Sequence, residues 1–470
     1  MFLFKIVRNP SRIKDLSLLI STLFIFYLLV HRHHTPSNLL IVPTTQPSST
    51  TTTTTTTTTV RHLFFSIASS SKSFPNRIPY LRLWYNPDST RAVLFLDQPP
   101  PDSSPSLSLP PILISADTSK FPYTFRGGSR SAIRIARIVK EAVDRNESDV
   151  RWFVFGDDDT VFFVDNLVKT LSKYDHDHWY YVGSNSEIYE QNEKYSFDMA
   201  FGGGGFAISH SLAKALGRVL DSCLMRYPHL YGSDARVYSC LAELGVGLSH
   251  EPGFHQIDIR GDLFGMLLAH PLSPLVSLHH LDAVEPIFPN MTRTRAMGHL
   301  FKAVNADPAQ ILQQTVCYDH SKSLTVSVAW GYAVQLFEGS RLLPDLLSWQ
   351  RTFRPWKRGK DVFSSHYMFK MREYPRDSCE RPVVFFLESV ISDTNGLWTN
   401  YRRHIVGNCS GIKGIQNLEQ IRVFSWKTYF DIEQLKAPRR QCCDISPSFS
   451  KSMVIDIRQC GVDELISMRK

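Results

Sequence analysis

Three consecutive aspartates, Asp157 to Asp159, are the residues of this sequence whose type and spacing point most directly to chemistry. They follow Gly156 and an unbroken apolar run, Trp152 to Phe155. A run without polar alternation is typical of a parallel strand covered on both faces. Ligands bind at the carboxyl ends of such strands, and clustered carboxylates suit a divalent cation that holds phosphate oxygens. We therefore predict a metal site here, although a solvated turn with Asp159 or Asp165 capping the next helix also fits.

Two further segments carry candidate functional residues. The four glycines Gly202 to Gly205 form a backbone that can approach a ligand closely, although a plain flexible loop is the alternative. Asp234 lies in the first turn of a predicted helix, where the helix dipole keeps a carboxylate ionised. Asp234 is therefore either a helix cap or a catalytic base, with Asp258 and Asp262 as the next candidates for the base.

An adjacent histidine pair, His279 and His280, is followed closely by Asp282. A single histidine is usually structural, but a pair beside an acid is a source of metal ligands in a chain that already requires a cation.

The elements that must position these residues alternate between strands and helices. Strands are predicted at 91–97, 112–117 and 179–182, and helices at 129–144 and 166–174. This alternation favours an α/β fold with a mainly parallel sheet. One helix carries a stripe of Arg130, Arg134 and Arg137, which fits a solvated face better than a diphosphate site. After about Thr315 the alternation ends, and strands are predicted at 324–334, 381–387 and 421–429.

The N-terminal region predicts a membrane anchor and a stem. Leu16 to Val30 is uncharged and apolar, basic residues precede it, and no small-residue cleavage site follows, so a signal anchor is favoured over a cleaved peptide. A segment rich in Thr, Ser and Pro follows, and ordered structure is expected from near Pro75. The predicted divisions are a cytoplasmic tail (1–15), an anchor (16–30), a stem (31–75), a catalytic domain (76–315) and a smaller β-rich C-terminal module (316–470).

The anchor places the rest of the chain in an oxidising lumen, which decides how the eight cysteines are interpreted. They include no C-x-x-C pair, so disulfides are favoured over zinc, and we predict a disulfide between Cys223 and Cys240. Sequons begin at Asn146, Asn290 and Asn408. The net charge of +8 is spread along the chain, which argues against a nucleic-acid groove.

The stretch from about Ile78 to Asn290 resembles the fringe-like β-1,3-glycosyltransferases of family 31, and most closely their plant fringe-related branch. Four motifs occur in the expected order, namely WFVFGDDDT at Trp152, GGGGF at Gly202, GSDAR at Gly232 and SLHHLD at Ser277. The resemblance implies a GT-A fold in a Golgi membrane protein whose catalytic domain is luminal. The C-terminal module resembles the plant branch only and has no counterpart in the animal enzymes, so the resemblance assigns it no role.

The resemblance also implies roles for individual residues. Asp157 and Asp159 would bind Mn²⁺, with His279 rather than His280 as the distal ligand. Asp157, Asp158, Gly203 and Gly204 would contact the UDP-sugar, and Asp234 would be the base of an inverting transfer to a glycan or glycoprotein hydroxyl. The donor sugar is expected to be galactose or N-acetylglucosamine.

Two other functions remain open on the sequence. One is a catalytically silent glycan-binding protein on the same scaffold. The other is a metal-dependent phosphoesterase, which would usually need more His and Asp ligands than one histidine pair supplies.

Overall fold

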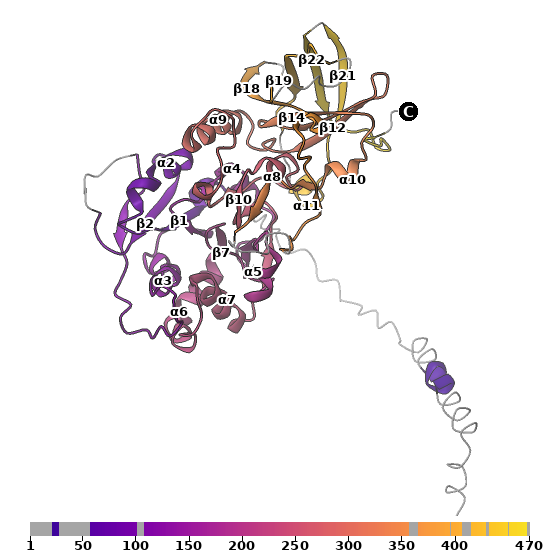
Figure 1. The fold of residues 1–470 in the computed structure, drawn as a ribbon. Coiled ribbons are helices and arrows are strands. Elements are labelled where there is room, and N and C mark those ends of the chain that lie inside the picture. Colours follow the sequence, from indigo (N-terminus) through magenta and orange to yellow (C-terminus); the bar gives the residue numbers. More distant parts are fainter. Residues whose placement is uncertain are drawn as a thin grey trace, which may run out of the picture. The chain divides into compact units, whose positions relative to one another are not determined.

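The computed structural model describes residues 21–27, 57–100, 108–356, 365–394, 396–406, 415–428, 432–449 and 451–467, and residues 57–470 form one compact unit (Figure 1). The expected cytoplasmic tail, most of the expected anchor and stem, and Asn408 lie outside the described residues. Residues 21–27 are helical. Among the described residues, no helix has the length and apolar character needed to cross a membrane.

A seven-stranded sheet organises the N-terminal half, and it is parallel throughout except for β7, as the alternation of elements predicts. Its strand order is β3 (Ile112–Ile114), β2 (Arg91–Leu96), β1 (Leu63–Ala68), β4 (Trp152–Asp157), β7 (Phe206–Ser209), β6 (Tyr181–Gly183) and β8 (Leu248–His250). Two β1 residues on opposite faces, Phe64 and Phe65, belong to different apolar clusters, so the sheet is buried on both sides.

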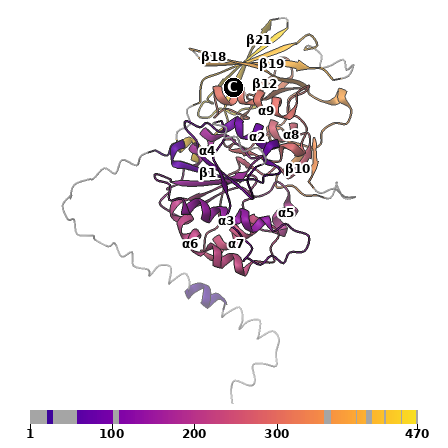
Figure 2. The ribbon, with the colours of Figure 1, turned by 90° about the vertical axis from the view of Figure 1, so that its left-hand side faces the viewer.

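The two faces of this sheet are covered differently. Figures 1 and 2 show α3 (Ser131–Asp144), α6 (His210–Arg226) and α7 (Ser233–Glu243) together on one side. The other face packs on α2 (Phe74–Trp84), α4 (Val164–Leu171) and α9 (Arg293–Ala306). Shorter elements around the site are β5 (Val161–Phe162), β9 (Phe254–His255), β10 (Ile259–Gly261), β11 (Ser277–Leu278), α5 (Tyr189–Lys194), α8 (Phe264–Leu268) and the 3₁₀ turn η3 (Leu281–Ala283).

The start of the ordered region corrects the predicted stem of 31–75. β1, all six of whose residues are buried, lies inside that stretch and is a central strand between β2 and β4. Its sequence, LFFSIA, is an apolar run like that of β4. The polar residues on both sides of the run concealed it, because they continue the Ser and Thr composition of the preceding segment.

The C-terminal half forms an eight-stranded sheet, which confirms its β-rich character (Figure 1). Its order is β12 (Gln314–Asp319), β13 (Leu324–Ala329), β14 (Ala333–Glu338), β18 (Val383–Asp393), β19 (Gly396–His404), β20 (Gln420–Ser425), β22 (Ser452–Arg458) and β21 (Cys442–Phe449). The single strand predicted at 324–334 is wrong, because Gly331, at φ +74°, turns the chain between β13 and β14. The remaining short elements are β15 (Trp349–Gln350), β16 (Phe353–Pro355), β17 (Met371–Arg372), α10 (Leu343–Leu346) and α11 (Ile432–Lys436).

Disulfides close this second sheet into a near-barrel. Its two terminal strands, β12 and β21, lie against each other and are joined by the Cys317–Cys443 disulfide. A second disulfide, Cys442–Cys460, ties the start of β21 to the end of β22. In the N-terminal half, Cys223 of α6 and Cys240 of α7 form the predicted disulfide, with their Cα atoms 5.9 Å apart.

The architecture changes at β12, next to the boundary predicted after residue 315, but the apolar core does not stop there. One cluster of buried side chains includes Val154 of β4, Leu300 of α9 and Val328 of β13. The two sheets therefore share a core within a single compact unit.

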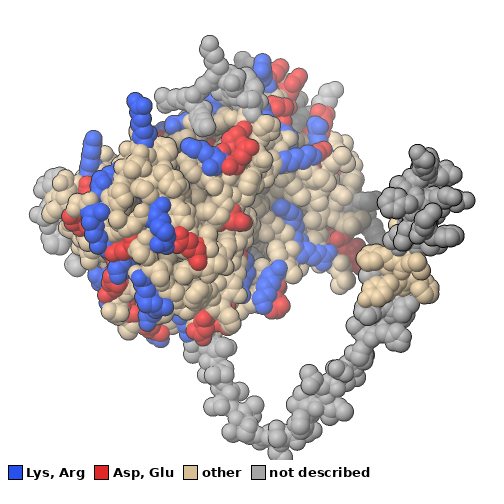
Figure 3. All heavy atoms as spheres, turned by 90° about the horizontal axis from the view of Figure 1, so that it is seen from below, with Lys and Arg blue, Asp and Glu red and all other residues tan. Residues whose placement is uncertain are grey.

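Charged residues of both signs are interspersed on the face in Figure 3. Ion pairs form between helices, as in Arg226 of α6 with Glu243 of α7, and within one helix, as in Lys140 with Asp144 of α3. The predicted solvated face of Arg130, Arg134 and Arg137 holds for Arg130, which is exposed, but not for the two arginines inside α3. Arg134 and Arg137 are buried; Arg134 donates to the carbonyl oxygens of Ser69 and Phe95, and Arg137 pairs with Asp221 and Glu141.

Candidate active site

The three aspartates lie at the carboxyl end of β4, as predicted. Asp157 ends the strand, and Asp158 and Asp159 follow in a tight turn. The Thr160 N–H donates to the Asp157 carbonyl at 3.0 Å, and the Asp157 N–H donates to Thr160 Oγ1 at 2.8 Å. Because β4 lies between β1 and β7, this turn is at the centre of the sheet.

The aspartate side chains do not all face the same way. Ser69 Oγ and Ser73 Oγ donate to Asp158 Oδ2 at 2.7 and 2.9 Å, which holds this carboxylate against the end of β1. Asp159 Oδ1 and Asp157 Oδ2 instead face His279 Nε2, at 3.1 and 3.7 Å. The structure thus brings Asp157, Asp159 and His279 together, with ligand atoms that all lie within 4.8 Å of one another.

The two adjacent histidines, His279 and His280, have different surroundings. His279 is buried, and its Nδ1 lies 3.3 Å from the Gln256 carbonyl, which leaves Nε2 for the aspartates. His280 adopts a left-handed backbone conformation, with φ 53°. Its ring stacks on Trp356 at 4.2 Å, and its Nδ1 lies 3.6 Å from Asp258 Oδ1. His279 is therefore the histidine that faces the aspartates.

Two basic groups, His279 and Arg77, lie beside the aspartates of this cluster. Burial opposes protonation of His279, but Asp159 and Asp157 outweigh it and raise its pKa to about 9. Burial disfavours the Asp159 carboxylate, yet His279 and Arg77 hold its pKa below the ordinary value. Arg77 of α2 lies 3.1 Å from Asp159 and 3.7 Å from Asp158, and it also pairs with Asp282.

The donor set fits a divalent cation. Two carboxylate oxygens and one imidazole nitrogen are ligands that such ions accept in proteins. Ligand bonds of about 2.0 to 2.6 Å place opposite ligands about 4 to 5 Å apart. The three ligand atoms, which all lie within 4.8 Å of one another, are therefore close enough together to hold one ion.

The four glycines form a fixed wall and not a loose loop. Thr160 Oγ1 donates to the Gly203 carbonyl at 2.7 Å, the Gly204 N–H donates to Gln256 Oε1 at 2.6 Å, and Ser277 Oγ also bonds the Gly204 carbonyl. A Cβ at Gly203 would overlap the His279 ring, and one at Gly202 would overlap the Asp234 carboxylate. The absence of side chains here lets the loop pass between these two residues.

Asp234 is the second residue of α7 and faces the glycine loop. Burial raises its pKa, while bonds from the Ser233 hydroxyl and the Gly202 N–H oppose that rise. The helix cap is Gly232, so Asp234 does not fill that position. Asp234, Gly202 and Asp157 line one small cavity of about 30 Å³, which places the base candidate across the loop from the metal ligands.

The two reserve candidates for the base lie elsewhere. Asp258 is buried and accepts a bond from Ser186 Oγ at 2.6 Å. Asp262 accepts from the Phe264 N–H and lines a separate cavity of about 440 Å³ together with residues of the C-terminal half, among them Tyr374 and Arg403.

Three residues that support the aspartates from the ends of β1 and α2 were not predicted. Ser69 and Ser73 lie inside the predicted stem of 31–75, and Arg77 lies just beyond it. The apolar run of β1 was the signal that could have found them, because a strand there predicts a further loop at the carboxyl end of the sheet.

Comparisons with known proteins identify the family of this chain and several relatives. A Fringe-like family model matches residues 58–263, and a family described as "Protein of unknown function, DUF604" matches residues 191–443. The chain is 30% identical over 154 residues to a β-1,3-glucosyltransferase of Mus musculus, covering 32% of this chain and 29% of the relative. It is 24% identical over 230 residues to a β-1,3-glucosyltransferase of Homo sapiens, covering 48% and 41%.

A third relative is the β-1,3-N-acetylglucosaminyltransferase lunatic fringe of Xenopus laevis, 42% identical over 77 residues, which cover 14% of this chain and 20% of the relative. The chain thus spans less than half the length of each of these three relatives. The DUF604 match alone covers more than half of the 470 residues. The chain belongs to the DUF604 family and carries a Fringe-like domain in its N-terminal half.

Proposed function

We propose that this protein is an inverting glycosyltransferase with a GT-A catalytic domain, which moves a sugar from a UDP-sugar to a hydroxyl group of a glycan or glycoprotein in β-1,3 linkage. The observation that carries the proposal is the meeting of Asp157, Asp159 and His279 at the centre of the sheet, with Asp234 across the glycine loop. The names of the three relatives support the reaction class.

The divalent cation of this proposal is Mn²⁺, which would be held by Asp157, Asp159 and His279. When bound, it supplies positive charge that stabilises the diphosphate of the departing UDP. Arg77 lies beside the same carboxylates, 3.1 Å from Asp159, and would pair with a phosphate oxygen of the donor. Asp158, held by two serine hydroxyls, would contact the UDP-sugar.

Asp234 is the proposed base. Its carboxylate accepts the proton of the acceptor hydroxyl while that oxygen bonds to the anomeric carbon and the bond from this carbon to UDP breaks. A pKa that burial raises suits this role, because a more basic carboxylate accepts the proton more readily. One displacement with one base inverts the anomeric configuration.

Release of UDP tests the proposal. The purified full chain is incubated with UDP-glucose, UDP-N-acetylglucosamine and UDP-galactose, with Mn²⁺ or with EDTA. We expect Mn²⁺-dependent UDP release from at least one donor, and none from that donor with the Asp159→Ala variant. Binding of the donor without any UDP release would indicate a silent binding protein. Hydrolysis of a simple phosphate ester would indicate a phosphoesterase.

We also propose a Golgi location with a single N-terminal anchor and a luminal catalytic domain. The three described disulfides suit an oxidising compartment, and the sequon residues Asn146 and Asn290 are exposed. Protease protection of intact microsomes tests this topology. Digestion of the C-terminal half from the cytosolic side would contradict it.

A further inference from the structure

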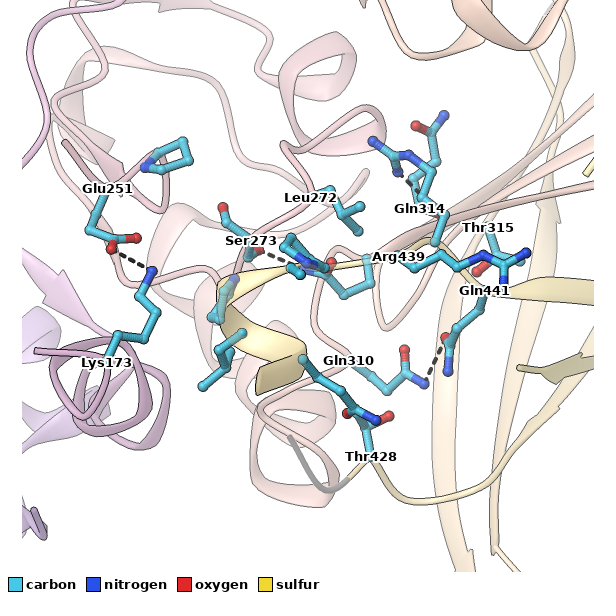
Figure 4. Close-up of a pocket in the computed structure, with 18 of the residues that line it drawn as sticks. Lys173, Glu251, Leu272, Ser273, Gln310, Gln314, Thr315, Thr428, Arg439 and Gln441 are labelled. Atoms are coloured by element: carbon cyan, nitrogen blue, oxygen red, sulfur yellow. Dashed lines mark hydrogen bonds and ion pairs between the residues drawn. The ribbon is translucent and has the colours of Figure 1, made fainter. Parts of the chain in front are cut away.

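A cavity of about 390 Å³ lies between the Fringe-like half and the C-terminal sheet. Figure 4 shows Lys173 and Glu251 on one side, Thr315 and Gln441 on the other, and Ser273 and Arg439 between them. Neither the metal-ligand candidates nor Asp234 line it, so it is distinct from the site described above.

The charged groups of this cavity are engaged with protein partners. Lys173 pairs with Glu251, which also accepts from the Tyr174 hydroxyl. Arg439 donates to the Gly461 carbonyl at 2.8 Å, and Arg440 donates to the Gln314 carbonyl at 3.2 Å. The charges of Lys173 and Glu251 balance, the carbonyl groups hold the two guanidinium groups in place, and the other polar side chains of the lining are mostly neutral.

The neutral lining is rich in amides and hydroxyls. Besides the hydroxyls of Ser273, Thr315 and Thr428, it includes six glutamines, namely Gln310, Gln313, Gln314, Gln434, Gln441 and Gln459. Amide and hydroxyl groups both donate and accept hydrogen bonds. A surface of this kind matches a neutral polyhydroxylated molecule, whose hydroxyls also do both.

Three lining residues carry buried polar atoms without a hydrogen-bond partner among the described residues. They are Ser273 Oγ, Gln314 Oε1 and Thr428 Oγ1. Buried polar atoms are normally paired, so each such atom requires an explanation. Their residues come from three separate segments that all line this cavity, so the unpaired atoms lie in the walls of the cavity.

We propose that this cavity is a carbohydrate-binding site for the end of a neutral glycan chain. Its volume falls within the roughly 300 to 1,000 Å³ of small-ligand sites. Both halves of the chain contribute to it, which gives the C-terminal sheet a part in glycan recognition. The proposal does not depend on sugar transfer, because the site is separate from the metal-ligand cluster.

Binding of neutral oligosaccharides tests it. The Asp159→Ala full chain is titrated with gluco-, galacto- and N-acetylglucosamine oligosaccharides, with a uronic-acid oligosaccharide as the acidic arm, and is followed by calorimetry and saturation-transfer NMR. We expect at least one neutral oligosaccharide to bind. Ser273→Ala and Thr428→Val each remove an unpaired hydroxyl, and each is expected to weaken binding about 5-fold, with the melting temperature unchanged or higher.

A matched control separates a ligand role from a structural one. Thr170 Oγ1 is also buried without a described partner, but Thr170 does not line the cavity, so Thr170→Val is expected to leave binding unchanged. Ala437→Trp, which fills the cavity from an exposed lining position, is expected to abolish binding. Binding of the acidic oligosaccharide alone, binding that UDP displaces, binding unaffected by the lining variants, or no binding at all would each overturn the proposal.

Discussion

The two sheets of this molecule use the ends of their strands differently. In the N-terminal sheet, β1 and β4 run parallel, so Ser69 and Asp157 to Asp159 emerge on the same side and their side chains meet. In the C-terminal sheet most neighbours are antiparallel, and its terminal strands are closed against each other by Cys317 and Cys443. Parallel strands thus gather ionisable groups at one place, whereas the closed sheet gains stability from a covalent bond. Substitutions should therefore affect activity in the first sheet and folding in the second.

The largest effect is expected from removing the disulfide that closes the C-terminal sheet. Replacing Cys317 and Cys443 by Ala should lower the free energy of unfolding by about 4 to 5 kcal/mol, because the bond closes a loop of 126 residues. The same change at Cys223 and Cys240, which are 17 residues apart, should cost about 3 kcal/mol. Urea denaturation followed by fluorescence measures both. A larger loss at the N-terminal pair would contradict the difference in loop length.

The second largest effect is expected from a substitution in the metal-ligand cluster. Asp159→Ala should abolish Mn²⁺-dependent UDP binding and lower transfer by about 10³-fold, or about 4 kcal/mol, because it removes a carboxylate ligand. Calorimetry with UDP and Mn²⁺ measures the binding. Asp177→Ala is the control, since Asp175, His176 and Asp177 form a similar but mostly exposed group. Unchanged UDP affinity in Asp159→Ala would exclude this residue from the site.

Asp234→Asn should lower kcat by roughly 10²-fold, which corresponds to about 2.7 kcal/mol, with little change in UDP affinity. The substitution keeps the shape of the side chain but removes the proton acceptor. Steady-state kinetics with the acceptor, beside calorimetry with UDP, separates these quantities. If turnover stayed at the wild-type level, Asp234 would have a structural role only.

The smallest effect is expected from a substitution of Asp258, which should raise the stability of the protein. Burial and Glu187 raise its pKa from 3.8 to about 6, so the folded state favours its protonated form. The stabilisation from this preference is complete below pH 3.8 and is lost as the pH rises to 6. Asp258→Asn should therefore raise stability at pH 7, and by much less at pH 4. Thermal unfolding at both pH values measures the effect, and an equal gain at both would contradict it.

The sequence predicted best those features that depend on local pattern. The apolar run of β4 and the aspartates after it could be read directly, and so could the Cys223–Cys240 pair, whose residues lie on consecutive helices. β1 was missed because polar segments on both sides concealed its short apolar run. The burial of Arg134 could not be predicted, because a helix pattern does not reveal that its guanidinium meets carbonyl groups at the ends of two strands.

Contacts between residues far apart in sequence could not be predicted either. The pairing of Arg77 with Asp159 joins residues 82 positions apart in sequence, and no local signal predicts it. The choice between His279 and His280 likewise depends on the left-handed turn at His280, which directs one ring to the aspartates and the other to Trp356.

The core shared by the two sheets has a consequence for the evolution of this chain. The DUF604 match, residues 191–443, begins inside the N-terminal half and runs through Asp234 and His279 into the second sheet as far as Cys443. A cut after residue 315 would expose apolar side chains on both sides, such as Leu300 and Val328. The C-terminal sheet is thus poorly suited to recombination as a separate domain. We expect the two halves to be inherited together and to diverge together.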